Sequence, residues 1–358
     1  MTSLFAVSLL SASADAKPPV RQGKPCPTVG AEVIKGRWVF TCTLKKGKKI
    51  WVRAPKPTPK QTWQVVAETV YSNSIKRMAP ESAVGFDFRV SPSFPPAKAS
   101  RIAEAVRQSY RPWQAIAPLP PDFPVLIMDE ASREWYLDQS ASFPGDPCGD
   151  YWWEMKQPDP TTATGGNCWS FDHDWGYMAV LQGSLTWTRP PPMLAHEAVH
   201  LAQFSLLGPR AMSTAECWLG EGMAEVYTGA LGFLDRDGKF DSRLTGNYRR
   251  SSVGDMRILS PGGNVASAAY WLQVIRDTED RTQEACWGTG LGYSLGYLVS
   301  EKLISDFGEQ SLFDWLALTR ASGDSDAAFA TVFGIDQDAW YEQSAAPYVA
   351  QEAALILG

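Results

Sequence analysis

The stretch PPPMLAHEAVHLAQFSLLGP, residues 190–209, predicts a single well-bounded helix. Proline is accepted in the first turn of a helix and a Gly-Pro pair ends one, so we expect the helix over Met193–Leu207. Side chains four residues apart share one face of a helix, which places the imidazoles of His196 and His200 side by side. Two imidazoles at this spacing can bind one zinc ion.

Glu197 lies next to the first of these histidines. On a helix its carboxylate can reach a water on the metal without becoming a ligand, which is the position of a general base. The chain has only three histidines, and two of them fall in this H-E-x-x-H pattern. The alternative is a pair of surface histidines, but the apolar flanks Met193-Leu194-Ala195 and Leu201-Ala202 favour a buried helix.

A second segment, Trp218–Glu225 (WLGEGMAE), supplies carboxylates for the same site. A catalytic zinc ion usually has three protein ligands and one open position, so two histidines leave it one ligand short. Glu221 is the predicted third ligand. Glu225, one helical turn later, is predicted to accept a ring N–H from a ligand histidine. The alternative, a solvated acidic face, fits poorly with the apolar residues around the pair.

The succession of H-E-A-V-H and W-L-G-E-G-M-A-E resembles the gluzincin clan of zinc metallopeptidases, and most closely its aminopeptidase-N-type branch. The resemblance implies Zn²⁺ held by His196, His200 and Glu221, with Glu197 as general base and acid. It also implies a thermolysin-like α+β fold, with strands before the active-site helix and a helical lobe after it.

Tyr293-Ser294-Leu295-Gly296 is similar to the Y-x-x-G segment that carries an oxyanion-stabilising tyrosine in that branch. The resemblance implies Tyr293 as a catalytic residue that polarises the scissile carbonyl. Tyr297, one turn later, is the alternative, and both could be core aromatics. No counterpart of the amine-binding G-A-M-E-N segment occurs. Gly176–Val180 lies at the corresponding place without a glutamate, although a strand there could pair with a bound peptide, so endopeptidase and exopeptidase action both stay open.

The segments before the motif alternate between strand and helix patterns. Trp135–Trp175 is rich in Gly, Pro, Asp and Trp and is predicted as a long loop, in which His173 either assists substrate binding or is structural. We expect strands at Phe86–Val90 and Pro124–Met128, a helix at Ala97–Tyr110, and a strand or hairpin at Gly176–Trp187.

The first residues have features of an export signal. Leu4–Leu10 is an apolar stretch and Ala14-Asp15-Ala16 a small-residue cleavage site, although no basic residue precedes them, and a frayed apolar terminus is the alternative. We therefore expect a signal peptide at residues 1–16 and a secreted, extracellular protein of bacterial type. No other stretch approaches the roughly 20 apolar residues that span a bilayer, so no transmembrane anchor is expected.

A small β module is expected at residues 17–53, followed by a proline-rich linker at residues 54–60 and a metallopeptidase-like domain at residues 61–358. The module has strand-like runs that a turn at Lys45–Lys48 interrupts. Its lysines could contact an anionic cell wall, and a solvated hairpin face is the alternative.

The chain has six cysteines, an even number that fits disulfides in an exported protein. The sequence leaves every pairing open, but short spacing favours two pairs, and no C-x-x-C spacing supports a cysteine-bound zinc instead. The expected disulfides are Cys26–Cys42, Cys148–Cys168 and, from what remains, Cys217–Cys286.

Composition and motifs together predict a function. The chain of 358 residues is 44% hydrophobic and 20% charged, as in ordinary globular proteins, and its net charge of −6 gives no support to a nucleic-acid partner. We expect a secreted zinc peptidase that hydrolyses a peptide or protein substrate through a zinc-activated water, with Glu197 as base. The alternative is a non-catalytic exported zinc-binding or cell-wall-associated protein, whose structural zinc would need a fourth ligand.

Overall fold

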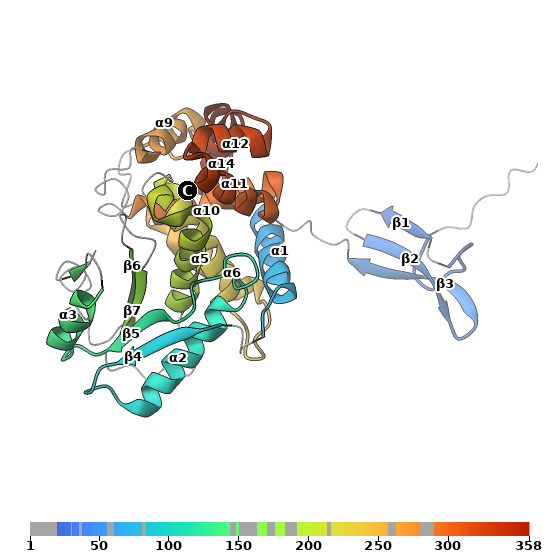
Figure 1. The fold of residues 1–358 in the computed structure, drawn as a ribbon. Coiled ribbons are helices and arrows are strands. Elements are labelled where there is room, and N and C mark those ends of the chain that lie inside the picture. Colours follow the sequence, from blue (N-terminus) through green and yellow to red (C-terminus); the bar gives the residue numbers. More distant parts are fainter. Residues whose placement is uncertain are drawn as a thin grey trace, which may run out of the picture. The chain divides into compact units, whose positions relative to one another are not determined.

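The computed structural model divides the chain into two compact units, Met1–Lys60 and Gln61–Gly358 (Figure 1). The protein is a mixed α+β molecule, mostly helical, with small sheets. The expected signal peptide at residues 1–16 and His173 lie outside the residues that the structure describes. The described residues are 20–29, 31–35, 38–55, 61–80, 84–143, 148–149, 163–169, 176–182, 192–212, 216–256, 263–279 and 290–357.

The first unit is a three-stranded antiparallel sheet in the order β1-β2-β3. So small a sheet buries little apolar surface, and the predicted disulfide between Cys26 and Cys42 staples it. Both cysteines pack with Phe40 and Trp51 in its core. The strands are β1 (Glu32–Lys35), β2 (Trp38–Lys45) and β3 (Lys48–Pro55). The last strand therefore takes in the first two residues of the segment expected as a linker.

The second unit contains a four-stranded sheet in the order β4-β5-β7-β6. Neighbouring strands β4, β5 and β7 are parallel, and β6 runs antiparallel to β7 at the edge. Three of the four strands lie where the sequence predicts them. The strands are β4 (Phe86–Val90), β5 (Phe123–Met128), β6 (Ala163–Trp169) and β7 (Gly176–Gln182).

Strand β6 and the helix α3 (Arg133–Ala141) correct the prediction of a long loop over Trp135–Trp175. Strand β6 contains Gly165, Gly166 and Asn167, residue types with poor strand propensity, so no local pattern marks it. Its conformation comes from the ladder that it forms with β7 along its whole length. A tertiary contact, and not local propensity, makes this segment a strand.

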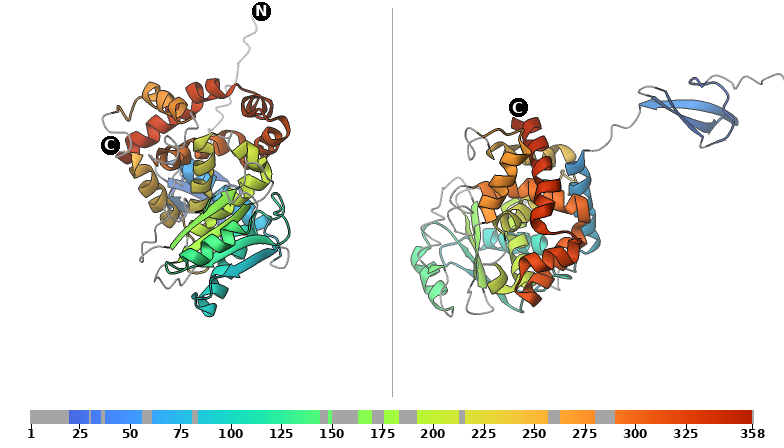
Figure 2. Two further views of the ribbon diagram at one scale, coloured as in Figure 1. Left: turned by 60° about the vertical axis from the view of Figure 1, so that its left-hand side comes forward. Right: turned by 90° about the horizontal axis from the view of Figure 1, so that it is seen from above.

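Helices make up most of the second unit, and every described strand of that unit precedes α5, as expected from the sequence. The helices are α1 (Thr62–Lys76), α2 (Pro96–Tyr110), α3, α5 (Pro192–Met212, interrupted at Gly208), α6 (Cys217–Leu231), α7 (Ser242–Gly254), α9 (Ala268–Glu279), α10 (Leu291–Phe307), α11 (Glu309–Ser322), α12 (Ser325–Phe333), α13 (Gln337–Trp340), the π-helix η3 (Tyr341–Ala345) and α14 (Ala346–Leu357). Figures 1 and 2 show α9, α11, α12 and α14 gathered at one end of the unit and the sheet at the other.

The sheet separates two apolar clusters because side chains alternate between its faces. Val125 and Ile127 of β5 face the main core, to which α2, α5 and α6 also contribute. Leu126 and Met128 face the opposite cluster, together with Tyr136 of α3. Strand β5 is thus buried on both faces, which explains its continuous apolar run. Helix α5 packs against the sheet and against α6, so the H-E-x-x-H segment lies inside the unit.

The described cysteines of the second unit are all disulfide-bonded. The predicted disulfide Cys148–Cys168 is present. Cys217, at the start of α6, is disulfide-bonded as well, and its expected partner Cys286 lies outside the described residues. Among the described helices, none is both long and apolar enough to cross a membrane.

A buried ion network ties α7, α10 and α14 together. Arg249 donates to Glu301 from Nε at 2.8 Å and from Nη2 at 2.7 Å, and Nη2 also donates to Glu352 at 2.9 Å. Only 4% of the Arg249 side chain and 2% of the Glu301 side chain are exposed. Burial raises the pKa of Glu301, and the guanidinium opposes that rise. The positive charge of Arg249 therefore compensates the negative charge of the buried Glu301 carboxylate.

Replacing Arg249 with methionine should destabilise the protein by about 3–5 kcal/mol, because the Glu301 carboxylate stays buried without its partner. Urea unfolding at neutral pH measures the loss. A carboxyl whose pKa is raised on folding favours the folded state at low pH and opposes it as the pH rises, so the deficit should shrink in acid. Arg276→Met, which breaks an exposed pair with Asp338, is the control and should change little. Equal losses would contradict the assignment.

Candidate metal centre

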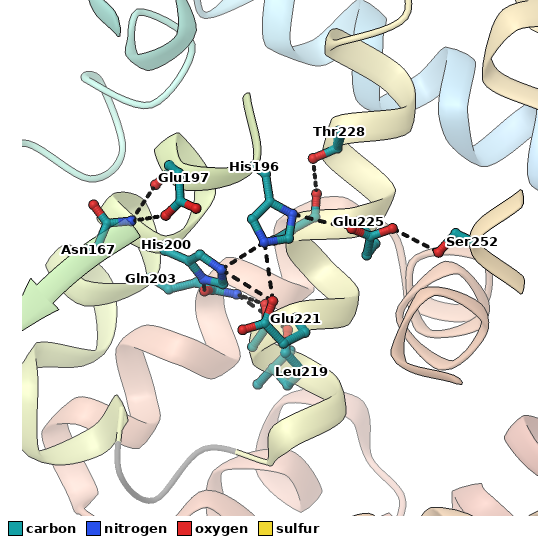
Figure 3. A network of polar contacts seen from close by, with 12 residues as sticks. Asn167, His196, Glu197, His200, Gln203, Leu219, Glu221, Glu225, Thr228 and Ser252 are labelled. Atoms are coloured by element: carbon teal, nitrogen blue, oxygen red, sulfur yellow. Dashed lines mark hydrogen bonds and ion pairs between the residues drawn. The ribbon is translucent and has the colours of Figure 1, made fainter. Parts of the chain in front are cut away.

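Two neighbouring helices bring the predicted metal ligands together. Helix α5 presents His196 and His200 from one face, and α6 presents Glu221 toward them (Figure 3). The two Nε2 atoms lie 3.1 Å apart, and Glu221 Oε2 lies 3.2 Å from His196 Nε2 and 3.5 Å from His200 Nε2. The three side chains are 12%, 11% and 1% exposed. This buried group could hold a metal ion.

The outer nitrogen of each imidazole has an acceptor beside it. His196 Nδ1 lies 3.3 Å from Glu225 Oε1, and His200 Nδ1 lies 2.8 Å from Gln203 Oε1. Because each of these oxygens accepts, the neutral form of each imidazole carries its hydrogen on Nδ1 and keeps a lone pair on Nε2. Two lone pairs and a carboxylate oxygen then face one another, which is the donor set of a cation site. Glu221 Oε1 is a further buried acceptor, without a hydrogen bond to any described residue.

The electrostatics of this group favour a positive charge at its centre. Burial lowers the pKa of His196, but hydrogen bonds to Glu221 and Glu225 outweigh burial and raise that pKa to about 10. Burial also opposes ionisation of Glu221, but His200 and His196 outweigh it and lower the pKa of this carboxyl. A metal cation can take the place of the proton, so metal binding should release protons and tighten as the pH rises.

Glu197 lies beside the ligand group without belonging to it. Asn167 of β6 donates from Nδ2 to the carboxylate Oε2 of Glu197 at 2.6 Å and to its main-chain oxygen at 3.1 Å. Glu197 is 7% exposed, and its Oε1 has no hydrogen bond to another described side chain. One amide thus holds both the backbone and the carboxylate of Glu197.

The two candidate tyrosines of α10 are placed differently. The ring of Tyr293 stacks on that of His196, with centroids 5.8 Å apart and planes at 15°. Burial raises the pKa of Tyr293 and the carboxylate of Glu221 adds to the rise, so the phenol stays protonated. The hydroxyl of Tyr297 instead lies against α6, where a Cβ built on Gly229 would come within 2.6 Å of it. Tyr293 is therefore the tyrosine beside the ligand group, and Tyr297 is a core aromatic.

Helices α6 and α10 touch backbone to backbone at two glycines. A Cβ on Gly222 would lie 2.1 Å from the carbonyl carbon and oxygen of Gly296, and one on Gly296 would lie 2.6 Å from the main-chain oxygen of Trp218. Only a residue without Cβ allows this approach. Since Glu221 directly precedes Gly222 and Tyr293 lies one turn before Gly296, the contact sets how close the tyrosine comes to the ligand group.

Gln203 joins both ligand helices with one side-chain amide. Its Oε1 accepts from His200 Nδ1, and its Nε2 donates to the main-chain oxygens of Gly220 at 2.9 Å and Leu219 at 3.3 Å. The side chain is buried, with 1% exposure. The same amide therefore orients one ligand and holds the backbone just before the other, Glu221.

Replacing Gln203 with methionine should weaken metal binding by about 10- to 100-fold, because His200 loses the acceptor that orients its ring. Competition with a chromophoric chelator measures the metal dissociation constant. Gln337→Met is the control, since this glutamine is also buried but its amide binds Tyr341. The control should lose stability and keep its metal affinity. An unchanged affinity in the Gln203 variant would contradict the positioning role.

Gln203 and Asn167 are site residues that the sequence analysis did not identify. Gln203 stands three residues after His200 on the same helix face, so the sequence did carry a signal for it. Asn167 lies 30 residues before Glu197 on a strand without a pattern, and only the fold brings the two together.

One expectation about the substrate is wrong. The strand at Gly176–Val180 was expected to be able to pair with a bound peptide, but β7 has β5 on one side and β6 on the other. Over Met178–Leu181 both of its backbone edges are therefore already paired. The edge strands of the sheet are β4 and β6, and β6 is the one that carries Asn167.

Comparison of the chain with protein families, with curated proteins and with solved structures finds no match.

Proposed function

We propose that residues 61–358 form a zinc-dependent peptidase, which hydrolyses peptide bonds in a peptide or protein substrate. The observation that carries the proposal is the convergence of three ligand atoms, from His196, His200 and Glu221, beside a carboxylate that is not one of the ligands. Three protein ligands leave a position open for water or substrate, whereas a structural zinc site has four. Among the described residues, no fourth His, Cys, Asp or Glu joins the group.

Zinc is the ion that this donor set favours. Two imidazole nitrogens and one carboxylate oxygen form a ligand set found in catalytic zinc sites, whereas magnesium and calcium prefer oxygen ligands throughout. A zinc ion held here would supply a Lewis acid for the attacking water and for the scissile carbonyl.

The residues around the ligands would carry the proton transfers. Glu197, held at Oε2 by Asn167, takes a proton from the attacking water at Oε1 and passes it to the leaving amine. Tyr293 keeps its own proton and donates a hydrogen bond to the oxyanion that develops on the carbonyl. Glu225 and Gln203 keep the two imidazoles in the tautomer that the ligand group needs.

The order of elements supports a gluzincin-like arrangement. Strands precede α5, α5 carries the H-E-x-x-H segment, and α6 supplies the glutamate. The disulfides fit an oxidising compartment, so we extend the proposal to secretion.

Metal analysis and peptide cleavage test the proposal together. We expect about one zinc ion per chain. We also expect cleavage of casein or of a peptide library, which stops when a chelator removes the metal and returns when zinc is added back. Zinc without cleavage of any peptide would favour the non-catalytic zinc-binding protein. A purified protein without metal affinity would contradict both functions.

A further inference from the structure

The charge of the chain is divided unevenly between its two units. Residues 1–60 hold 12 of the 33 Lys and Arg but only 2 of the 39 Asp and Glu, which gives this unit a net charge of +10 and leaves −16 on residues 61–358. The overall charge of −6 hides this division. A small unit with so large a positive charge attracts anions over several ångströms beyond its surface.

Lysines gather at the tip of the β2–β3 hairpin. Lys45, Lys46, Lys48 and Lys49 occupy its turn and strand ends, and all four are exposed. Lys24 is exposed as well, and its segment joins the same sheet through the Pro25–Ile50 bridge. The unit has only two acidic residues, Asp15 and Glu32, against twelve basic ones. Two carboxylates cannot neutralise the charge of these five lysines.

Two features of the hairpin tip lower its stability while leaving these charges exposed. Lys45 and Lys48 lie directly opposite each other across the strands, an arrangement in which like charges repel. Lys46 has a φ of 51° and Gly47 a φ of 74°, so the lysine stands at a left-handed position where Asn, Asp or Gly is usual. Features that oppose stability in this way are expected at functional surfaces.

We infer that this hairpin binds a linear anionic polysaccharide outside the cell, a second binding activity that does not depend on the proposed hydrolysis. The Cys26–Cys42 disulfide of the same unit points to an oxidising compartment, where surface polysaccharides are found. Four lysines offer point charges rather than the planar forks with which arginine reads phosphates. Trp51 is 3% exposed and gives no platform on which a base could stack.

Binding of the full chain to polygalacturonate over a salt series tests the inference. The variant with Lys45, Lys46, Lys48 and Lys49 all changed to Gln should bind about tenfold more weakly or worse at low salt. The slope of log affinity against log salt should fall by about one for each lysine removed. The control changes four exposed basic residues of the second unit to Gln and should bind as the wild type does. These are Lys76, Arg101, Arg236 and Lys239.

Three results would overturn the inference. The first is that the wild type does not bind polygalacturonate at low salt. This result is expected if the negative charge of residues 61–358 cancels the attraction of residues 1–60 for anions. The second is an equal weakening of binding in the hairpin variant and in the control, which would show that binding depends only on the net charge of the chain. The third is tighter binding to duplex DNA or to vesicles of phosphatidylglycerol, which would assign the hairpin to a nucleic acid or a membrane. None of these results bears on peptide cleavage.

Discussion

Replacing Glu197 with glutamine should abolish peptide hydrolysis, with a loss of about a thousandfold or more, because an amide cannot take a proton from the attacking water. Glutamine keeps the shape of the side chain, and its oxygen can still accept from Asn167 Nδ2. The three ligand atoms come from other residues, so the metal content should not change. Rate measurements and metal analysis on the same preparation check both expectations.

Glu134→Gln is the matched control for this variant. The side chain of Glu134 is 86% exposed on α3, so the same chemical change should leave activity intact. Full activity in the Glu197 variant would mean that another group takes the proton, and the assigned role would be wrong. Loss of the metal would instead place Glu197 among the ligands.

Replacing Gly222 with alanine should destabilise the protein by about 3 kcal/mol or more, because the new Cβ would lie 2.1 Å from the backbone of Gly296. Neither backbone can give way without separating α6 from α10. That separation would also carry Tyr293 away from His196, so activity should fall even where the variant is folded. Thermal unfolding measures the first effect, and the rate of peptide cleavage below the unfolding transition measures the second.

Gly220→Ala is the control that distinguishes the loss of this contact from a general effect of alanine in α6. A Cβ on Gly220 meets nothing within 4 Å, although the residue lies only two positions earlier on the same helix. Alanine favours helix over glycine, so this variant should gain up to about 1 kcal/mol. Similar stabilities for the two variants would show that the close approach of α6 and α10 does not limit the fold.

The contact between Gly222 and Gly296 gives a physical reason for the glycine in each of two sequence motifs. Gly222 belongs to W-L-G-E-G and Gly296 to Y-S-L-G, and in the structure the two residues face each other. Each segment pairs its glycine with a polar residue of the site, Glu221 in one and Tyr293 in the other. The glycines bring the helices together, and the polar side chains then meet near the histidines.

Much of the fold before α5 follows local patterns and was predicted from them. The strands β4, β5 and β7 and the helix α2 lie close to their expected positions, because apolar alternation and helical periodicity mark them. The helix α5 starts at Pro192 and is interrupted at Gly208, as its flanking residues predict. Strand β6 was missed, because its glycines and asparagine give no strand signal of their own.

The sequence by itself determined which side chains share a helix face. The spacing of His196 and His200, and that of Glu221 and Glu225, follows from hydrogen bonds between residues four apart, so no distant contact is needed. Only the tertiary structure shows how α5 and α6 pack together, that Asn167 holds Glu197, and that α10 approaches α6 closely enough to place Tyr293 over a histidine. These contacts join residues far apart in the chain, and their geometry depends on packing that no local pattern encodes.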